Sequence, residues 1–438
     1  MRIGNNLINF APKLYAMVTR ETIREIIIDN RQQVAKREII SRNFNFMDNA
    51  CYVLIGVRRA GKSYLLYQRI QQLIRNGHSW EEIVYINFED ERLLEMQAAD
   101  LNKILEVHQM MTDKMPLLFL DEIQNITGWD KFARRLTENK YSVIVTGSNA
   151  KMLSREIETT LGGRFFTKYI IPYNFREFLR ANDVDFSANA LYSTKQKGRI
   201  IKHLETFITF GGFPESLAYN SKRDYVAGVF QKILLGDIVL RNSIRNDYAM
   251  KILIKKIAES SAAELSYTKL HNILKTIGIS VGKESVINYI SYAEDAYLIF
   301  RIHNFFAKFA DMESTPKYYF SDNGLLNLFL TDKKTRLLEN IVAVCLHQKY
   351  PDGVYYLKSP KTDIDIDFYV PEIETAIQVS YSISDEITKK REVDNLVALK
   401  QNFNGAKHFI IITYDEEDNV SISETEIQII PVYKFLIQ

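Results

Sequence analysis

The sequence predicts an α/β protein with a parallel sheet in its front half, a helical middle and a second α/β unit at its C-terminal end. Between residues 51 and 180, short apolar runs alternate with stretches of helical periodicity. Continuously apolar strands separated by helices are typical of a parallel sheet covered on both faces. From residue 316 onward strand-like and helical segments alternate again. At 438 residues, the chain is long enough for about three domains.

The composition excludes several classes of protein. Hydrophobic residues make up 46% of the chain and charged residues 25%, which is typical of packed globular cores and excludes a largely disordered protein. The net charge of +2 is too close to zero for a general binder of polyanions. No apolar run reaches the roughly 20 residues needed to cross a bilayer. We therefore expect a soluble cytoplasmic protein that contacts no membrane.

The charge is distributed unevenly along the chain. Residues 339–438 contain 9 basic and 17 acidic residues, so an acidic end follows a basic front. Cys51 and Cys345 each lie in an apolar stretch, which favours two buried thiols over a disulfide or a metal site.

Five segments follow from these patterns. Helical periodicity over residues 20–40 predicts an amphipathic helix that leads into the first sheet. The last segment is expected to contain helices at about 335–349 and 386–401. The predicted segments are a helical lead (1–45), the parallel-sheet core (46–180), a helical connector (181–248), a further helical segment (249–330) and the second α/β unit (331–438).

A phosphate-binding loop is the strongest motif. The pattern GxxxxGK[ST] directly follows the apolar strand CYVLI and opens the helix SYLLYQRI. The glycines let backbone N–H groups surround phosphates, and a helix N-terminus favours anions. We expect Lys62 to reach the β- and γ-phosphates and Ser63 to ligate Mg²⁺; Arg58 and Arg59 could contact phosphate or an interface. The expected nucleotide-binding residues are Gly56, Val57, Arg58, Arg59, Ala60, Gly61, Lys62, Ser63 and Tyr64.

A pair of carboxylates follows a second apolar strand. The run LLFL ends in Asp121 and Glu122, as a Walker B element does. Asp121 is expected to hold Mg²⁺, and Glu122 to polarise the attacking water. The alternative is that both charges cap the next helix.

Two further positions are candidates for sensing the γ-phosphate. The strand SVIVT ends near Ser148 and Asn149, which could orient the water or cap a helix. Arg164 follows a glycine pair and is a candidate finger that reaches a γ-phosphate, either in its own subunit or across an interface. A surface arginine is the alternative.

These motifs resemble a known family. The set GVRRAGKS, LLFLDEIQNITGW, VIVTGSNA, GGR and IIPYNFREFL is similar to the AAA+ family of prokaryotic P-loop ATPases that carry a winged-helix segment and a restriction-nuclease-like C-terminal domain. The resemblance implies ATP and Mg²⁺ as cofactors, and the preference for ATP over GTP rests on it alone. Gln124 and Trp129 match the family pattern, with packing as the simpler role. The implied roles are Walker B for Asp121 and Glu122, sensor 1 for Ser148 or Asn149, and finger for Arg164.

The segment 249–330 has helix-turn-helix spacing followed by a strand, and it resembles a winged helix. The second helix offers Lys283 but also Glu284, whereas groove entry needs several cations near phosphates. Both protein packing and direct DNA contact stay open.

The C-terminal segment resembles a damaged PD-(D/E)xK nuclease. Glu339 matches the helix acid, and the strand DIDF supplies Asp365 and Asp367. On the next strand Gln378 and Ser380 stand where the pattern requires an acid and a lysine, and Lys358 or Lys361 could supply the missing lysine from elsewhere. An active nuclease, an inert relic and a purely structural domain remain open. The expected relic site comprises Glu339, Asp365, Asp367 and Gln378.

The motifs together predict an ATP-driven conformational switch or motor that acts on a protein partner or assembles as a homo-oligomer. The alternatives are a nucleic-acid-binding regulator controlled by ATP and, third, an ATP-coupled DNA nuclease.

Overall fold

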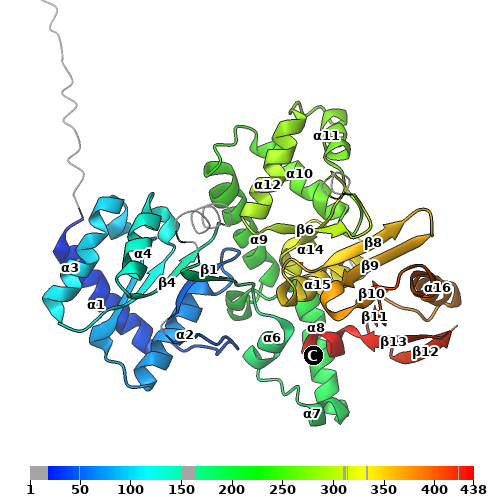
Figure 1. Cartoon of the computed structure of the whole chain (residues 1–438), viewed down its shortest axis with the longest axis horizontal. Helices are drawn as coiled ribbons and strands as arrows, with labels where there is room; N and C mark the ends of the chain where they lie inside the picture. Colours follow the sequence, from blue (N-terminus) through cyan, green and yellow to red (C-terminus); the bar gives the residue numbers. More distant parts are fainter. Residues whose placement is uncertain are drawn as a thin grey trace, which may run out of the picture.

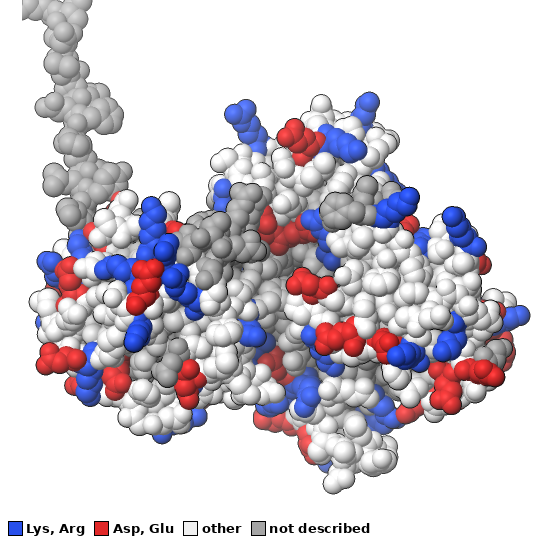
Figure 2. Space-filling view, in the orientation of Figure 1, with Lys and Arg blue, Asp and Glu red and all other residues white. Residues whose placement is uncertain are grey.

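The computed structural model describes residues 18–48, 50–149, 161, 163–308, 312, 314–331, 334–422 and 424–438. Figure 1 shows one lobe around a first sheet and another around a second sheet, with a group of helices between them. On the face drawn in Figure 2, basic and acidic side chains are interspersed over both lobes, as a net charge near zero predicts.

The first sheet has five strands in the order β2-β3-β4-β1-β5, and every neighbouring pair is parallel. All five residues of β1 are buried, because helices cover both faces. The predicted parallel sheet is therefore confirmed. Its strands are β1 (Cys51–Ile55), β2 (Ile83–Asn87), β3 (Leu117–Asp121), β4 (Ser142–Gly147) and β5 (Phe165–Tyr169).

The described residues of this lobe also include α1 (Arg20–Lys36), α2 (Lys62–Arg75), α3 (Asn102–Met111) and α4 (Trp129–Glu138). The predicted amphipathic helix is α1, which ends four residues earlier than expected. It begins where the Thr19 hydroxyl accepts a hydrogen bond from the Thr22 amide, and it buries Ile23, Ile26 and Ile27. Helix α1 packs on β2 and α3.

The middle of the chain is helical, as predicted. A π-helix, η7, continues α9 without a break and presents Asp237 to the first lobe. The elements are α6 (Phe175–Ala181), α7 (Ala188–Tyr192), α8 (Thr194–Phe210), η6 (Pro214–Ala218), α9 (Lys222–Lys232), η7 (Ile233–Leu240), α10 (Asp247–Glu259), α11 (Tyr267–Thr276) and α12 (Lys283–Asp295).

The second sheet has eight strands in the order β12-β13-β11-β10-β9-β8-β6-β7, with parallel and antiparallel pairs. Two of its strands, β6 and β7, come from the segment 249–330, so the sheet continues across the boundary expected after residue 330. The sequence did not predict β12 and β13. The strands are β6 (Ile299–Asn304), β7 (Lys317–Phe320), β8 (Tyr355–Ser359), β9 (Ile364–Val370), β10 (Thr375–Val379), β11 (His408–Thr413), β12 (Asp418–Ile422) and β13 (Thr425–Pro431).

Helices α15 (Lys334–Lys349) and α16 (Glu386–Asn402) confirm the two helices expected here. The sequence did not predict α14 (Asn323–Asn327) or α17 (Val432–Ile437). Within the described residues, no helix combines the length and apolar character needed to cross a membrane.

A buried polar junction joins the middle helices to this second lobe. The carboxylate of Asp322 accepts hydrogen bonds from the amides of Gly212 (2.7 Å) and Gly324 (2.8 Å). Burial raises the pKa of Asp322 to about 6. The side-chain amide of Asn323 donates to the carbonyls of Ile208 (3.0 Å) and Leu337 (2.8 Å). These bonds hold the end of α8 against the start of α15.

Gly212 is fixed by a close approach of two backbones. A Cβ atom at this position would lie 2.0 Å from the carbonyl oxygen of Tyr173, whereas a Cβ at Gly228, inside α9, would meet nothing within 4 Å. We expect Gly212→Ala to lower the free energy of unfolding by about 2 kcal/mol or more, because the backbone must move.

The matched control is Gly228→Ala, which should raise stability by up to about 1 kcal/mol through helix propensity. Denaturant unfolding measures both variants. Equal effects of the two substitutions would contradict the packing argument.

Candidate nucleotide-binding site

The loop between β1 and α2 begins at the C-terminal end of β1. Gly56 has φ +147°, and a Cβ there would lie 2.0 Å from the carbonyl oxygen of Ile170, so only glycine fits. Gly61, with φ +92°, is the N-cap of α2. The loop therefore turns sharply and surrounds the N-terminus of α2. A helix N-terminus favours a bound anion.

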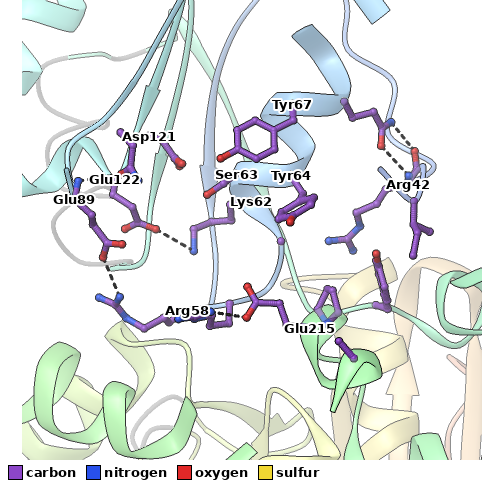
Figure 3. A pocket seen from close by; sticks show the side chains of 18 of the residues that line it. Arg42, Arg58, Lys62, Ser63, Tyr64, Tyr67, Glu89, Asp121, Glu122 and Glu215 are labelled. Carbon is purple, nitrogen blue, oxygen red and sulfur yellow. Dashed lines mark hydrogen bonds and ion pairs between the residues drawn. The ribbon is translucent and has the colours of Figure 1, made fainter. Parts of the chain in front are cut away.

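Lys62 is the first residue of α2, and its side chain is only 3% exposed. Its ammonium donates to the carbonyls of Gly56 (3.1 Å) and Val57 (3.2 Å) and lies 3.7 Å from Oε1 of Glu122. The buried cation is thus balanced by loop dipoles and one carboxylate. Figure 3 shows Lys62 pointing toward Glu122.

Asp121 ends β3, where its carboxylate accepts hydrogen bonds from the hydroxyls of Tyr85 (2.7 Å) and Thr146. Ser63 also hydrogen-bonds to it. Burial and, secondarily, the charge of Glu122 raise the pKa of Asp121. The adjoining oxygens of Ser63 and Asp121 are the hard donors that Mg²⁺ prefers, so these two residues fit the metal that the motif implies.

Glu122 adopts a left-handed backbone conformation, with φ +52°. Its amide donates to the Thr146 hydroxyl (2.9 Å), and the amide of Gln124 donates to its carboxylate (2.5 Å). Burial alone would raise the pKa of Glu122, but Lys62 and then Gln124 outweigh burial and hold this pKa below its usual value. Glu122 is therefore an ionised acceptor held in one orientation.

These side chains line a cavity of about 580 Å³, large enough for a nucleotide. Its far wall comes from the helical middle, including Pro214, Glu215 and Tyr219. Tyr64 lies in the wall, with its ring 5.3 Å from that of Tyr67. The cavity is thus enclosed between two parts of the chain (Figure 3).

Two loop arginines connect the loop to this far wall. The guanidinium of Arg58 donates to both carboxylate oxygens of Asp237 (2.8 and 3.1 Å) and to Glu89 (2.9 Å). Hydrogen bonding to Asp237 raises the pKa of Arg58. Arg59 pairs with Glu215. The phosphate loop is therefore tied directly to η6 and η7.

The two sensing candidates lie outside the cavity lining. Asn149 is buried beyond the end of β4, while its neighbour Ser148 hydrogen-bonds to Glu122 and lies 3.4 Å from Nε2 of Gln124. Arg164 precedes β5 at the end of the sheet opposite the loop, is exposed, and pairs with Glu138 at 3.6 Å. In this arrangement Arg164 does not approach the site of its own chain.

Sequence reasoning missed several residues of the site. Gln124 was assigned to packing, yet it orients the carboxylate of Glu122. Tyr85 and Thr146 hold Asp121, and Asp237 holds Arg58. Tyr85 and Thr146 lie on β2 and β4, the two strands that flank β3, and this position is what could have indicated their contact with Asp121. Nothing in the sequence indicates that Asp237 contacts the loop.

The predicted relic site of the C-terminal lobe has Asp365 and Asp367 on β9, Gln378 on β10 and Glu339 on α15. Gln378 Oε1 accepts from the Asp367 amide (2.9 Å), and its Nε2 donates to Glu392 (2.9 Å). The Asp367 carboxylate accepts from the Val379 amide (2.9 Å). Glu339 accepts from the Tyr319 hydroxyl (2.8 Å). These oxygens are engaged within the protein, and no cluster of three or more metal-binding side chains occurs in the described residues.

A lysine that the sequence did not single out lies in this set. The ammonium of Lys317, on β7, is 3.7 Å from Asp367 and 5.1 Å from the centre of the Tyr356 ring. Burial opposes its charge, but Asp367 and then Glu339 outweigh burial and raise the pKa of Lys317. Of the two lysines considered from the sequence, Lys358 pairs with Glu264 (3.2 Å) and Asp365 (3.7 Å), and Lys361 is exposed.

Two related chains have been found among curated proteins. The chain is 33% identical to "Uncharacterized protein MJ1544" of Methanocaldococcus jannaschii, over 97% of each chain. It belongs to the same family as this archaeal protein. A protein of Haemophilus influenzae is 28% identical, over 93% of this chain and all of its own length.

Two family models match parts of the chain. An AAA domain (AAA_14) matches residues 48–179, and a domain of unknown function (DUF8612) matches residues 201–336. The first match covers the five-stranded sheet and the loop. This chain therefore carries an AAA-type P-loop ATPase domain over these residues.

Solved structures resemble the chain only distantly. The Walker-type ATPase PABY2304 of Pyrococcus abyssi covers 72% of this chain and 96% of its own, with 13% identity and a TM-score of 0.38. The ORC1 protein of Aeropyrum pernix, solved in complex with DNA, covers 75% of this chain and 96% of its own, with 14% identity and a TM-score of 0.27. Scores this low carry no argument about this chain.

Glu339 makes the stability of the C-terminal lobe depend on pH. Burial and the neighbouring Asp367 raise the pKa of Glu339 to about 8, from an ordinary value of 4.5. Because the folded pKa is the higher one, the protonated form contributes stability that is complete below pH 4.5 and lost as pH rises through 8. We expect the melting temperature of the wild type to fall by about 4 °C more than that of Glu339→Gln between pH 5 and pH 8.5.

Glutamine retains the acceptor for Tyr319 and cannot ionise in this range. Thermal melts monitored by circular dichroism at both pH values test the expectation. Parallel pH dependence in the two proteins would show that Glu339 does not titrate as described.

Proposed function

We propose that the protein hydrolyses Mg-ATP and that the state of the nucleotide moves the helical middle relative to the first lobe. The observation that carries the proposal is the convergence of Lys62, Ser63, Asp121 and Glu122 at the C-terminal ends of β1 and β3. In α/β sheets, ligands bind beyond this end of the strands. The cavity volume of about 580 Å³ supports a nucleotide as the occupant.

The residues divide the work of phosphoryl transfer. Lys62 would neutralise the β- and γ-phosphates, and Ser63 and Asp121 would hold Mg²⁺, which supplies charge stabilisation when bound. Glu122, ionised and oriented by Gln124, would accept the proton of the attacking water. Because Gln124 holds the Glu122 carboxylate, the Asp121 carboxylate would remain available to bind Mg²⁺.

The link from nucleotide to movement runs through Arg58. Its guanidinium is bound to Asp237 on η7 and lines the same cavity as Lys62. A triphosphate in the cavity would compete with Asp237 for this cation, because both are anions that prefer a bidentate guanidinium. Binding would thereby loosen η7 from the loop, and hydrolysis would restore the contact.

The outer parts of the chain complete the proposal. Helices α11 and α12 are followed by β6 and its antiparallel partner β7, an order that supports a winged-helix-like unit. We propose the C-terminal lobe as an inert nuclease-like relic, since the oxygens of Asp367 and Gln378 serve the protein itself. The finger role of Arg164 across an interface, the five-segment division and a cytoplasmic location belong to the same proposal.

Glu122→Gln tests the hydrolytic role. The substitution keeps the shape and removes the base, so we expect the rate of phosphate release to fall by at least about 100-fold while binding of an ATP analogue changes little. Phosphate release under saturating Mg-ATP and calorimetric titration with the analogue provide the two measurements.

Glu91→Gln is the matched control, because Glu91 is an exposed acid of the neighbouring 3₁₀ turn and does not line the cavity. It should release phosphate at the wild-type rate. Unchanged turnover in Glu122→Gln would remove Glu122 from the mechanism.

Asp237→Asn tests the competition for Arg58. With the Asp237 carboxylate gone, Arg58 keeps its contact with Glu89 but has two donors available for phosphate. We expect the dissociation constant of Mg-ATP to fall by about 5- to 10-fold, the equivalent of about 1 kcal/mol. Calorimetric titration of wild type, Asp237→Asn, Arg58→Ala and Arg58→Ala/Asp237→Asn gives the comparison.

The gain must disappear when Arg58 is also replaced, because the cycle isolates the pair. Asp247→Asn, which removes an exposed acid from the start of α10, controls for the change in charge. Equal affinity in wild type and Asp237→Asn would refute the link between loop and η7.

The regulator alternative differs in one measurable respect. If nucleic acid controlled the ATPase through the middle segment, duplex DNA would raise the rate of phosphate release, and added salt would abolish the increase. An ATPase rate independent of DNA would favour a protein target.

A further inference from the structure

A second cavity, of about 350 Å³, lies beside the nucleotide site but opens elsewhere. Its walls come from β5, α6 and the ends of α15 and α17. Figure 1 shows α6 close to the C-terminal end of the chain. Direct packing of α17 against α6 and α15 agrees with this view. The cavity therefore forms only when the first lobe, the helical middle and the C-terminal lobe are assembled.

Cations dominate the charged groups of this cavity. Lys168 comes from β5, Arg176 and Arg180 from α6, and Lys349 from the end of α15. Within the described part of the chain, none of these four forms an ion pair with an Asp or Glu side chain. All four side chains are exposed, and like charges from three elements around one concave surface favour an anion there.

The carboxylate among the lining residues does not offset this charge. Both oxygens of Glu177 accept from the guanidinium of Arg42, each at 2.8 Å, and the pair is buried. Arg42 also donates to the carbonyl of Ala60 (3.0 Å) in the phosphate loop. Arg42 and Glu177 thus neutralise each other and form the wall between the two cavities.

The nucleotide cavity shows the contrast. There Arg58 pairs with Asp237, Arg59 with Glu215, and Lys62 with Glu122. Three cations of the first cavity are thus paired with carboxylates, whereas Lys168, Arg176, Arg180 and Lys349 of the second form no ion pair with an Asp or Glu side chain within the described residues.

Neighbouring groups restrict three of the four cations. The ammonium of Lys349 lies 5.8 Å from the centre of the Phe435 ring, and the guanidinium of Arg176 lies 5.8 Å from that of Phe186. Arg180 donates to the carbonyl of Ser41 (3.3 Å), and Arg176 donates to a main-chain oxygen of Gln438 (3.5 Å). These contacts leave further N–H donors on each group and reduce the entropy lost when a ligand binds.

We infer that this second cavity binds a ligand bearing several phosphate groups. Its volume lies in the range of small-molecule sites, and guanidinium and ammonium groups around a concave surface are suited to phosphate oxygens. The phosphates belong either to a free polyphosphate compound or to a nucleic-acid backbone, which share this chemistry. The inference does not depend on ATP hydrolysis at the first site.

The test first weakens phosphate binding at the nucleotide site, so that binding at the second cavity can be measured. In a Lys62→Ala background, calorimetric titration with tripolyphosphate and fluorescence anisotropy with a labelled single-stranded oligonucleotide report the remaining phosphate binding. We expect at least one probe to bind. Adding Lys168→Glu and Lys349→Glu should weaken that binding by at least about 100-fold, since two attractions become repulsions.

Lys131→Glu with Lys195→Glu is the matched control, because both lysines are exposed, lie on α4 and α8, and are absent from the cavity lining. It makes the same change in net charge and should leave binding within about threefold. If charge reversal disturbs the thermal melt, Lys168→Gln with Lys349→Gln replaces it, with an expected loss of about 10-fold.

The two probes distinguish the sources of phosphate. Tripolyphosphate binding without oligonucleotide binding indicates a free compound, whereas tighter oligonucleotide binding with a steep salt dependence indicates a nucleic-acid backbone. Failure of both probes to bind the Lys62→Ala protein overturns the inference, as does equal weakening by the control pair.

Discussion

The ammonium of Lys62 is the charge on which the arrangement of the first lobe depends. It is buried at the start of α2, and it is balanced by two loop carbonyls and by Glu122. An isolated buried cation would cost several kcal/mol, so the loop, β3 and α2 must stay in register to balance it. The same balance keeps Glu122 ionised beside Asp121, whose pKa is raised. One buried cation thereby separates the roles of two adjacent carboxylates.

Charges from the loop extend this arrangement to the rest of the molecule. Arg58 binds Asp237 of η7, and Ala60 accepts from Arg42, which is paired with Glu177 on α6. Because paired charges in a partly buried interface are costly to separate, any change in the loop is felt on both α6 and η7. The phosphate loop is thus connected to the middle segment by directional bonds as well as by apolar packing.

In the C-terminal lobe, the polar side chains that the sequence singles out bond to other groups of the protein. Ser380 occupies the position at which the nuclease pattern requires lysine, and the cation near the acids is instead Lys317 from a strand 63 positions earlier in the sequence. Gln378 links Asp367 to Glu392 rather than offering its oxygen to a ligand. The sequence pattern therefore identified these acidic residues, and the structure shows that Glu339 and Asp367 accept hydrogen bonds from other groups of the protein.

The sequence alone determined the parallel sheet, its order of strands and helices, and the loop with Lys62 and the pair Asp121 and Glu122, because these depend on local periodicity and on motifs within a few residues. It missed β12, which buries no residue and has no apolar run, and β13, whose buried residues alternate with exposed or half-buried ones. Only the tertiary structure decided which distant side chains meet: Asp237 with Arg58, and Lys317 with Asp367. It also decided that Lys168 and Lys349 line the same cavity. Such partners are set by how the elements pack, and packing leaves no regular spacing along the chain.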